Sequence, residues 1–88
     1  MSKEYTVIYP NNKKDHYTLP TGVEYLTLDT AQNLVGGNIE ILILGDKMMI
    51  VNEDGINLKL EYNKIASELC GYASINGIVI YGDDDLLD

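Results

Sequence analysis

The segment LVGGNIEILILGDKMMIVNEDG, residues 34–55, is the most apolar stretch of the chain and decides how the chain folds. Two runs of strand-forming residues in it are separated only by Gly45-Asp46-Lys47. A loop this short joins the strands of a hairpin, so the two runs are expected to pair antiparallel. Both runs are apolar on both faces over part of their length. This pattern predicts strands that lie at the centre of a sheet or have one face covered by a partner.

Helical periodicity replaces this pattern on each side of the hairpin. Residues 27–35 place their apolar side chains on one helical face, and Gly36 supplies the left-handed residue that ends such a helix. Residues 64–70 repeat the helical pattern, and Asn63 is suited to cap the N-terminus of this second helix. The hairpin is therefore expected to lie between two short helices.

The remaining strand signals lie towards the two ends of the chain. Residues 5–9 and 16–19 are β-branched and aromatic around a Pro-Asn-Asn-Lys turn, which predicts an N-terminal hairpin. Residues 75–81 predict a last strand. The expected order is strand, strand, helix, strand, strand, helix, strand.

This order predicts an α+β fold, with a mainly antiparallel sheet of about five strands and two short helices on one face. We expect a single domain over residues 1–82 and an acidic C-terminal tail over residues 83–88. The other face of the sheet is then a candidate dimer surface, and we expect a homo-oligomer. The residues assigned to this interface are Leu42, Leu44, Met48 and Met49.

The chain is strongly acidic. Its 88 residues include 14 Asp and Glu against six basic residues, all of them Lys, for a net charge of -8. Binding to nucleic acid or to an anionic membrane needs a cationic surface, so both are disfavoured. Long-range electrostatics favour a partner with a basic surface. The acids expected to face that partner are Glu53, Asp54, Asp83, Asp84 and Asp85.

Residues for catalysis or for binding a metal are scarce. Cys70 and His16 are the only residues of their kinds, too few for a zinc site, and nothing in the sequence links them. Gly36-Gly37 precedes a strand, whereas a phosphate-binding glycine loop follows one. Asn52-Glu53-Asp54-Gly55 lacks the first ligand of a calcium loop and fits a β-turn better. We therefore expect a protein that is not an enzyme and has no cofactor.

The sequence also indicates a cellular setting. The N-terminus lacks the apolar core of a signal peptide, and no apolar run is long enough to span a bilayer. A single cysteine fits a reducing compartment. We therefore expect a location in the cytoplasm.

Several segments resemble a family of small phage, plasmid and bacterial proteins, the domain of unknown function 3846. The helix followed by Val-Gly-Gly-x-Ile-Glu is the distinctive part of the resemblance. The family implies an accessory protein of a mobile element and implies no catalytic residue. The segments concerned are AQNLVGGNIE (31–40), VNEDG (51–55), NKIAS (63–67) and INGIVI (75–80).

These observations lead to three hypotheses. In the first, the protein binds and inhibits a host protein such as a defence nuclease, and its acidic groups imitate nucleic acid. In the second, it sequesters a nucleotide immune signal between protomers. In the third, it is a structural or regulatory homodimer. The ligand site of the second hypothesis would comprise Gly36, Gly37, Asn52 and Asn63.

Overall fold

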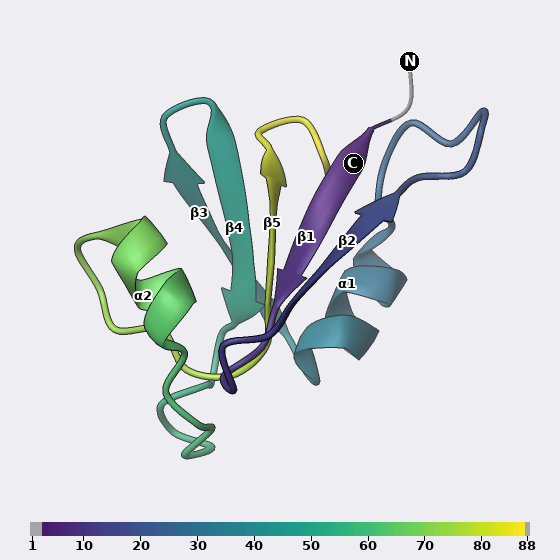
Figure 1. Cartoon of the computed structure of the whole chain (residues 1–88). Helices are drawn as coiled ribbons and strands as arrows, with labels where there is room; N and C mark the ends of the chain where they lie inside the picture. Colours follow the sequence, from purple (N-terminus) through teal and green to yellow (C-terminus); the bar gives the residue numbers. More distant parts are fainter. Residues whose placement is uncertain (1–2, 88) are drawn as a thin grey trace.

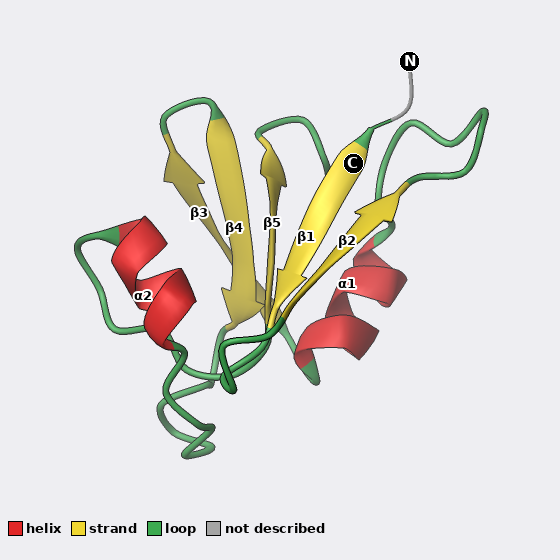
Figure 2. Ribbon diagram, in the orientation of Figure 1, coloured by secondary structure: helices red, strands yellow, loops and turns green. Residues whose placement is uncertain are grey.

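The computed structural model describes residues 3–87 and contains one five-stranded sheet with two helices (Figures 1 and 2). The strand order is β2-β1-β5-β4-β3, and every neighbouring pair is antiparallel. The α+β class and the expected order of elements are confirmed. The elements are β1 (Glu4–Ile8), β2 (Lys14–Thr18), α1 (Leu28–Val35), β3 (Ile39–Leu44), β4 (Lys47–Asn52), α2 (Lys64–Cys70) and β5 (Val79–Asp83).

The central hairpin forms as the short loop predicts. Leu44 pairs with Lys47, and only Gly45 and Asp46 lie between them. Gly45 has a φ of 68°, a left-handed conformation that glycine adopts without a steric penalty. Glycine at the first position of a two-residue loop is typical of the turns that match the twist of antiparallel strands. The turn therefore sets the register of β3 against β4.

The helices lie on opposite faces of the sheet, which corrects the prediction that they share one face. Met48 and Ile50 of β4 belong to a core cluster with the α1 residue Ala31. Met49 of β4 belongs to a second cluster with Ala66 of α2. Because successive residues of a strand point to opposite faces, these two clusters lie on the two sides of the sheet.

The same arrangement corrects the assignment of the two methionines to an interface. Met48 is 4% exposed and Met49 is fully buried. β4 lies between β3 and β5, and a helix covers each of its faces, so both side chains pack within the chain itself. The predicted interface residues Leu42 and Leu44 are half-buried at the margin of the α2 cluster.

The C-terminal segment is part of the domain, which corrects the boundary predicted after residue 82. Asp83 is the last residue of β5, and the Leu86 side chain is buried in the α1 cluster. The Leu26 N–H donates to the Leu86 carbonyl at 2.8 Å. A Cβ on Gly82 would lie 2.9 Å from the Leu86 side chain, so a residue without a side chain allows this close packing. Of the predicted tail, only Asp88 lies outside the described residues.

Candidate protein-binding edge

The two edge strands of the sheet differ in their chemistry. β2 has the sequence KDHYT, and charged residues of this kind normally prevent an exposed edge from pairing with another chain. β3 has the sequence IEILIL, in which Glu40 is the only charged residue. It contains no proline and no glycine, and β3 lies at the outer edge of the sheet (Figure 1). An apolar edge of this kind is a ready template for an added strand.

The backbone groups on the open side of β3 follow from its register with β4. The Glu53 N–H donates to the Asn38 carbonyl at 2.8 Å, just before β3 begins. In an antiparallel pair, alternate residues bond to the neighbouring strand and the residues between them point away. Since the even-numbered residues of β3 bond to β4, the N–H and C=O groups of the odd-numbered ones point outwards. We call this row of outward groups, from Ile39, Ile41 and Ile43, the β3 edge.

The side chains along the β3 edge are only partly covered. Ile39 packs against the α1 cluster, whereas Ile41 is 42% exposed and Ile43 is 58% exposed on the same face. Sequence reasoning did not select these two isoleucines, because it placed β3 with β4 and did not establish which of them is an edge strand. The local pattern of the two strands is nearly the same.

On the α2 face, a hollow of about 490 Å³ runs alongside β3, and we call it the β3 groove. Its wall combines aliphatic, aromatic and acidic side chains. The pKa of the Tyr72 hydroxyl is raised, first by desolvation and then by neighbouring Cys70 and Glu40. The residues that line the groove include Glu40, Leu42, Glu53, Ile56 and Tyr72.

The five acids predicted to bind a partner are not brought together. Glu53 and Asp54 follow β4, whereas Asp83 lies opposite Lys47 at the other end of that strand. Along a six-residue strand the two ends are about 20 Å apart. Asp84 and Asp85 follow Asp83 in sequence and so lie towards its end.

Lysines already contact two of the C-terminal acids. The Lys47 ammonium donates to the Asp83 carboxylate. Lys3 lies 3.3 Å from the Asp85 carboxylate. These contacts reduce the negative charge at the end of β5. Glu53 takes part in none of the ion pairs formed within residues 3–87, and it lines the β3 groove.

The residues of the alternative ligand site have internal structural roles. The Asn63 amide donates to the carbonyls of Ile8 and Gly77, and its oxygen accepts from the Ala66 N–H. The Asn52 amide donates to the Val35 carbonyl at 3.1 Å. Both side chains are buried, so these amides are not presented to a ligand.

The two glycines of that site have local structural explanations. Gly36 ends α1 with a φ of 83°. A Cβ on Gly37 would lie 3.1 Å from the Asn52 amide nitrogen, a tight contact that glycine avoids. None of the four residues is therefore a donor directed at an open site.

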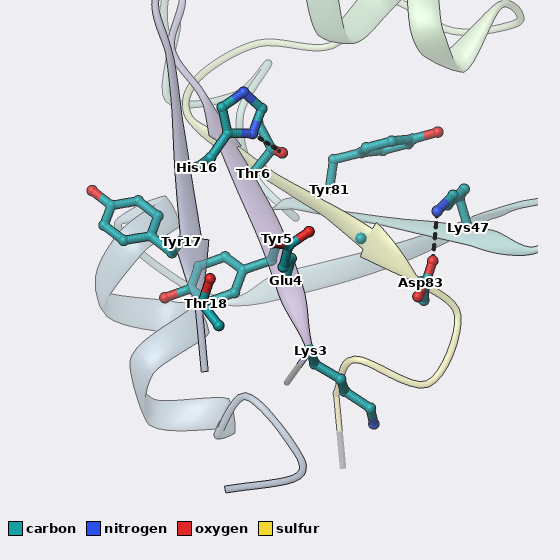
Figure 3. Close-up of a pocket in the computed structure, with 11 residues that line it drawn as sticks. Lys3, Glu4, Tyr5, Thr6, His16, Tyr17, Thr18, Lys47, Tyr81 and Asp83 are labelled. Atoms are coloured by element: carbon teal, nitrogen blue, oxygen red, sulfur yellow. Dashed lines mark hydrogen bonds and ion pairs between the residues drawn. The ribbon is translucent and has the colours of Figure 1, made fainter. Parts of the chain in front are cut away.

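A second hollow, of about 600 Å³, lies on the α2 face and is lined by residues of β1, β2 and β5 together with Lys3 and Lys47 (Figure 3). The Thr6 hydroxyl and the His16 ring are hydrogen-bonded at 2.9 Å, and Lys47 is bonded to Asp83. Cys70, in contrast, is buried in the α2 cluster. Among residues 3–87, no group of three or more potential metal ligands is gathered. This hollow therefore resembles an ordinary solvated sheet face.

Comparisons with known proteins place the chain in a family. Neither a curated protein nor a solved structure matches it. Within the described part of the chain, no helix has the length and apolar character needed to cross a membrane. The family model for a domain of unknown function, DUF3846, matches residues 5–86, which include every strand and helix except the first residue of β1. The chain therefore belongs to the domain of unknown function 3846 family.

Proposed function

We propose that this chain is a non-enzymatic binding protein of a phage or other mobile element, and that it inhibits a host protein with a basic surface in the host cytoplasm. A defence nuclease is the kind of target that we favour. The observation that carries the proposal is the unprotected, apolar β3 edge flanked by carboxylates. The mobile-element setting is supported by the resemblance of the chain to small phage, plasmid and bacterial proteins.

Electrostatics support a basic target. Glu40 lies on β3, Asp46 lies in the turn that follows it, and Glu53 lies beside its first residues. The net charge of the whole chain is -8. Such a field accelerates encounter with a positively charged protein and disfavours acidic partners. Apolar contacts along the β3 edge would then hold the complex after encounter.

The proposal is tested by capture from a lysate of the natural host. The full chain is immobilised, and bound proteins are released by stepwise salt or by excess duplex DNA. We expect a basic nucleic-acid-binding protein that both treatments release, because screening weakens charge pairing and DNA competes for the same surface. Captured proteins that resist both treatments, or a nucleotide found by native mass spectrometry of the purified chain, would contradict the proposal.

A further inference from the structure

We infer that the β3 edge accepts one extended segment of a basic partner as a sixth strand, with apolar residues of the segment on the α1 face and Lys or Arg on the α2 face. The inference rests on the proposed function for the identity of the partner as a basic protein. It adds the mode of binding and the side-chain pattern that is recognised. Strand addition of this type obtains affinity from main-chain hydrogen bonds and specificity from alternate side chains.

The backbone of β3 sets the alternation of the added strand. Residues paired directly with Ile39, Ile41 and Ile43 share the face of those isoleucines, because opposed residues in a ladder point to the same side. Ile41 and Ile43 leave apolar surface exposed there. Val or Ile at these positions of the partner would cover that surface. The intervening residues of the partner must then lie on the α2 face, over the β3 groove.

The β3 groove is suited to a cationic side chain. The carboxylates of Glu40 and Glu53 line it, and so do the apolar side chains of Leu42 and Ile56. The methylene stem of Lys or Arg packs against apolar surface while its charged end remains solvated. Tyr72 adds an aromatic ring, which attracts a cation placed over its face. The groove and the edge together therefore favour alternating apolar and basic residues.

A second copy of the chain fits this surface less well. Antiparallel pairing of two β3 strands about Ile41 would place both Glu40 residues on one face as diagonal neighbours, about 7–8 Å apart along the backbone and within reach of each other's charge. Each copy also has a net charge of -8. An edge about 20 Å long and about 10 Å deep offers roughly 200 Å², far below the ~800 Å² per partner of a stable interface. A basic protein can contact the edge, the groove and the flanking carboxylates together.

The first test uses the isotope-labelled full chain and the capped heptapeptide Lys-Val-Lys-Val-Lys-Val-Lys as the probe. We expect the amides of Ile39, Ile41 and Ile43 to exchange rapidly in the free protein and at least about tenfold more slowly with saturating peptide. In an antiparallel added strand, the valines opposite the three isoleucines donate the ladder hydrogen bonds. A peptide of the same sequence with N-methylated valines cannot donate them and should give no slowing. Equal slowing by both peptides, or none by the unmodified one, would overturn the inference.

Variants of the chain distinguish binding at the β3 edge from binding that depends only on overall charge. Ile43→Lys introduces a lysine on the edge strand, which is how natural proteins commonly prevent strand pairing. This variant should bind the peptide at least about tenfold more weakly. Leu58→Lys adds the same charge at a side chain that is 57% exposed, outside β3, and should leave affinity nearly unchanged. Glu40→Gln should weaken binding about two- to fivefold, the range for exposed ion pairs. Equal losses for the two lysine variants would refute edge binding.

The same variants distinguish this inference from the proposed function. If wild type and Ile43→Lys capture the same basic host protein equally, the chain binds its target without the β3 edge, and the inference fails alone. If the peptide protects the edge but no basic protein is captured, the proposed function fails alone. If edge amides become protected with rising protein concentration and no peptide, a second copy occupies the edge and the inference is wrong.

Discussion

At the residue scale, Asn63 connects three parts of the molecule. Its side chain caps α2 through the Ala66 N–H and also donates to the carbonyls of Ile8 in β1 and Gly77 before β5. The residue is fully buried. Thr27 caps α1 in the same way, through the Thr30 N–H at 3.2 Å, but at an exposed site. The sequence predicted the Asn63 cap, whereas its two other bonds depend on segments distant in the chain.

This difference predicts unequal costs for the two caps. Asn63→Ala should lower the free energy of unfolding by about 3 kcal/mol, because it removes a cap and two further buried hydrogen bonds, to the carbonyls of Ile8 and Gly77. Thr27→Ala should cost about 1 kcal/mol. Urea denaturation followed by circular dichroism measures both. Similar losses for the two variants would show that the Asn63 bonds to Ile8 and Gly77 contribute little.

Ionisation of Tyr5 is expected to lower the stability of the fold in alkaline solution. Its ring stacks on Tyr17 with 5.3 Å between ring centroids. Desolvation first, and the neighbouring Tyr17 second, raise the pKa of Tyr5 above its ordinary value of 10.0. The unfolded chain therefore loses this proton at lower pH than the folded chain, and stability falls as pH rises through the unfolded pKa.

The free energy of unfolding is measured below and above pH 10.0, the ordinary pKa of tyrosine. Tyr5→Phe should flatten the alkaline decline, because phenylalanine cannot ionise. Tyr62→Phe is a suitable control, since Tyr62 is 52% exposed and has no such stacking partner among residues 3–87. An alkaline decline that is the same in all three proteins would refute a role for Tyr5.

At the element scale, the position of a strand in the sheet decides what its side chains do. β3 and β4 have similar apolar patterns, yet β4 is covered on both faces and β3 leaves Ile41 and Ile43 exposed. β5 separates β4 from β1, although 26 residues of chain, 53–78, lie between β4 and β5. The composition of β3 alone therefore cannot distinguish a core strand from an open edge.

The C-terminal segment packs into the core through Leu86. Leu86 is 1% exposed within the α1 cluster, although it follows three consecutive aspartates. Leu86→Ala should lower the free energy of unfolding by about 2–4 kcal/mol, the range for a buried leucine. Leu58→Ala, at an exposed side chain, should change it by less than about 0.5 kcal/mol. Thermal and urea unfolding of both variants decide whether the segment is part of the cooperative domain.

At the scale of the whole molecule, negative charge acts on stability as well as on binding. The chain has a net charge of -8, and three ion pairs form within residues 3–87. Self-repulsion of the remaining acids opposes the compact state, and salt screens it. The field that favours a basic partner therefore also lowers the stability of the free protein.

Melting at two ionic strengths tests this effect. Raising NaCl from about 0.01 M to about 0.15 M shortens the Debye length from about 30 Å to about 8 Å and should raise Tm by a few degrees. Asp84→Asn should reduce that rise, since it removes one acid from the crowded end of β5. Asp83→Asn should reduce it less, because Lys47 already pairs with that carboxylate. A Tm that falls with salt would show that the ion pairs outweigh the repulsion.

The sequence by itself determined the elements and their order, because the signals for them are local. Gly45-Asp46 specifies a tight turn, Gly36 and Gly71 end the helices in left-handed conformations, and Asn63 caps α2. Family membership could also be read from the sequence, because the helix and the following Val-Gly-Gly-x-Ile-Glu are contiguous. The net charge that favours a basic partner is likewise a property of composition.

Only the tertiary structure decided how these elements meet. Strand order, the placement of the helices on opposite faces, the burial of Met48 and Met49 and the packing of Leu86 all depend on contacts between distant segments. The same contacts separate the predicted acids and leave β3 at an edge beside Tyr72. A local pattern states which side chains avoid water, whereas the packing of the whole chain determines which of them remain exposed for a partner.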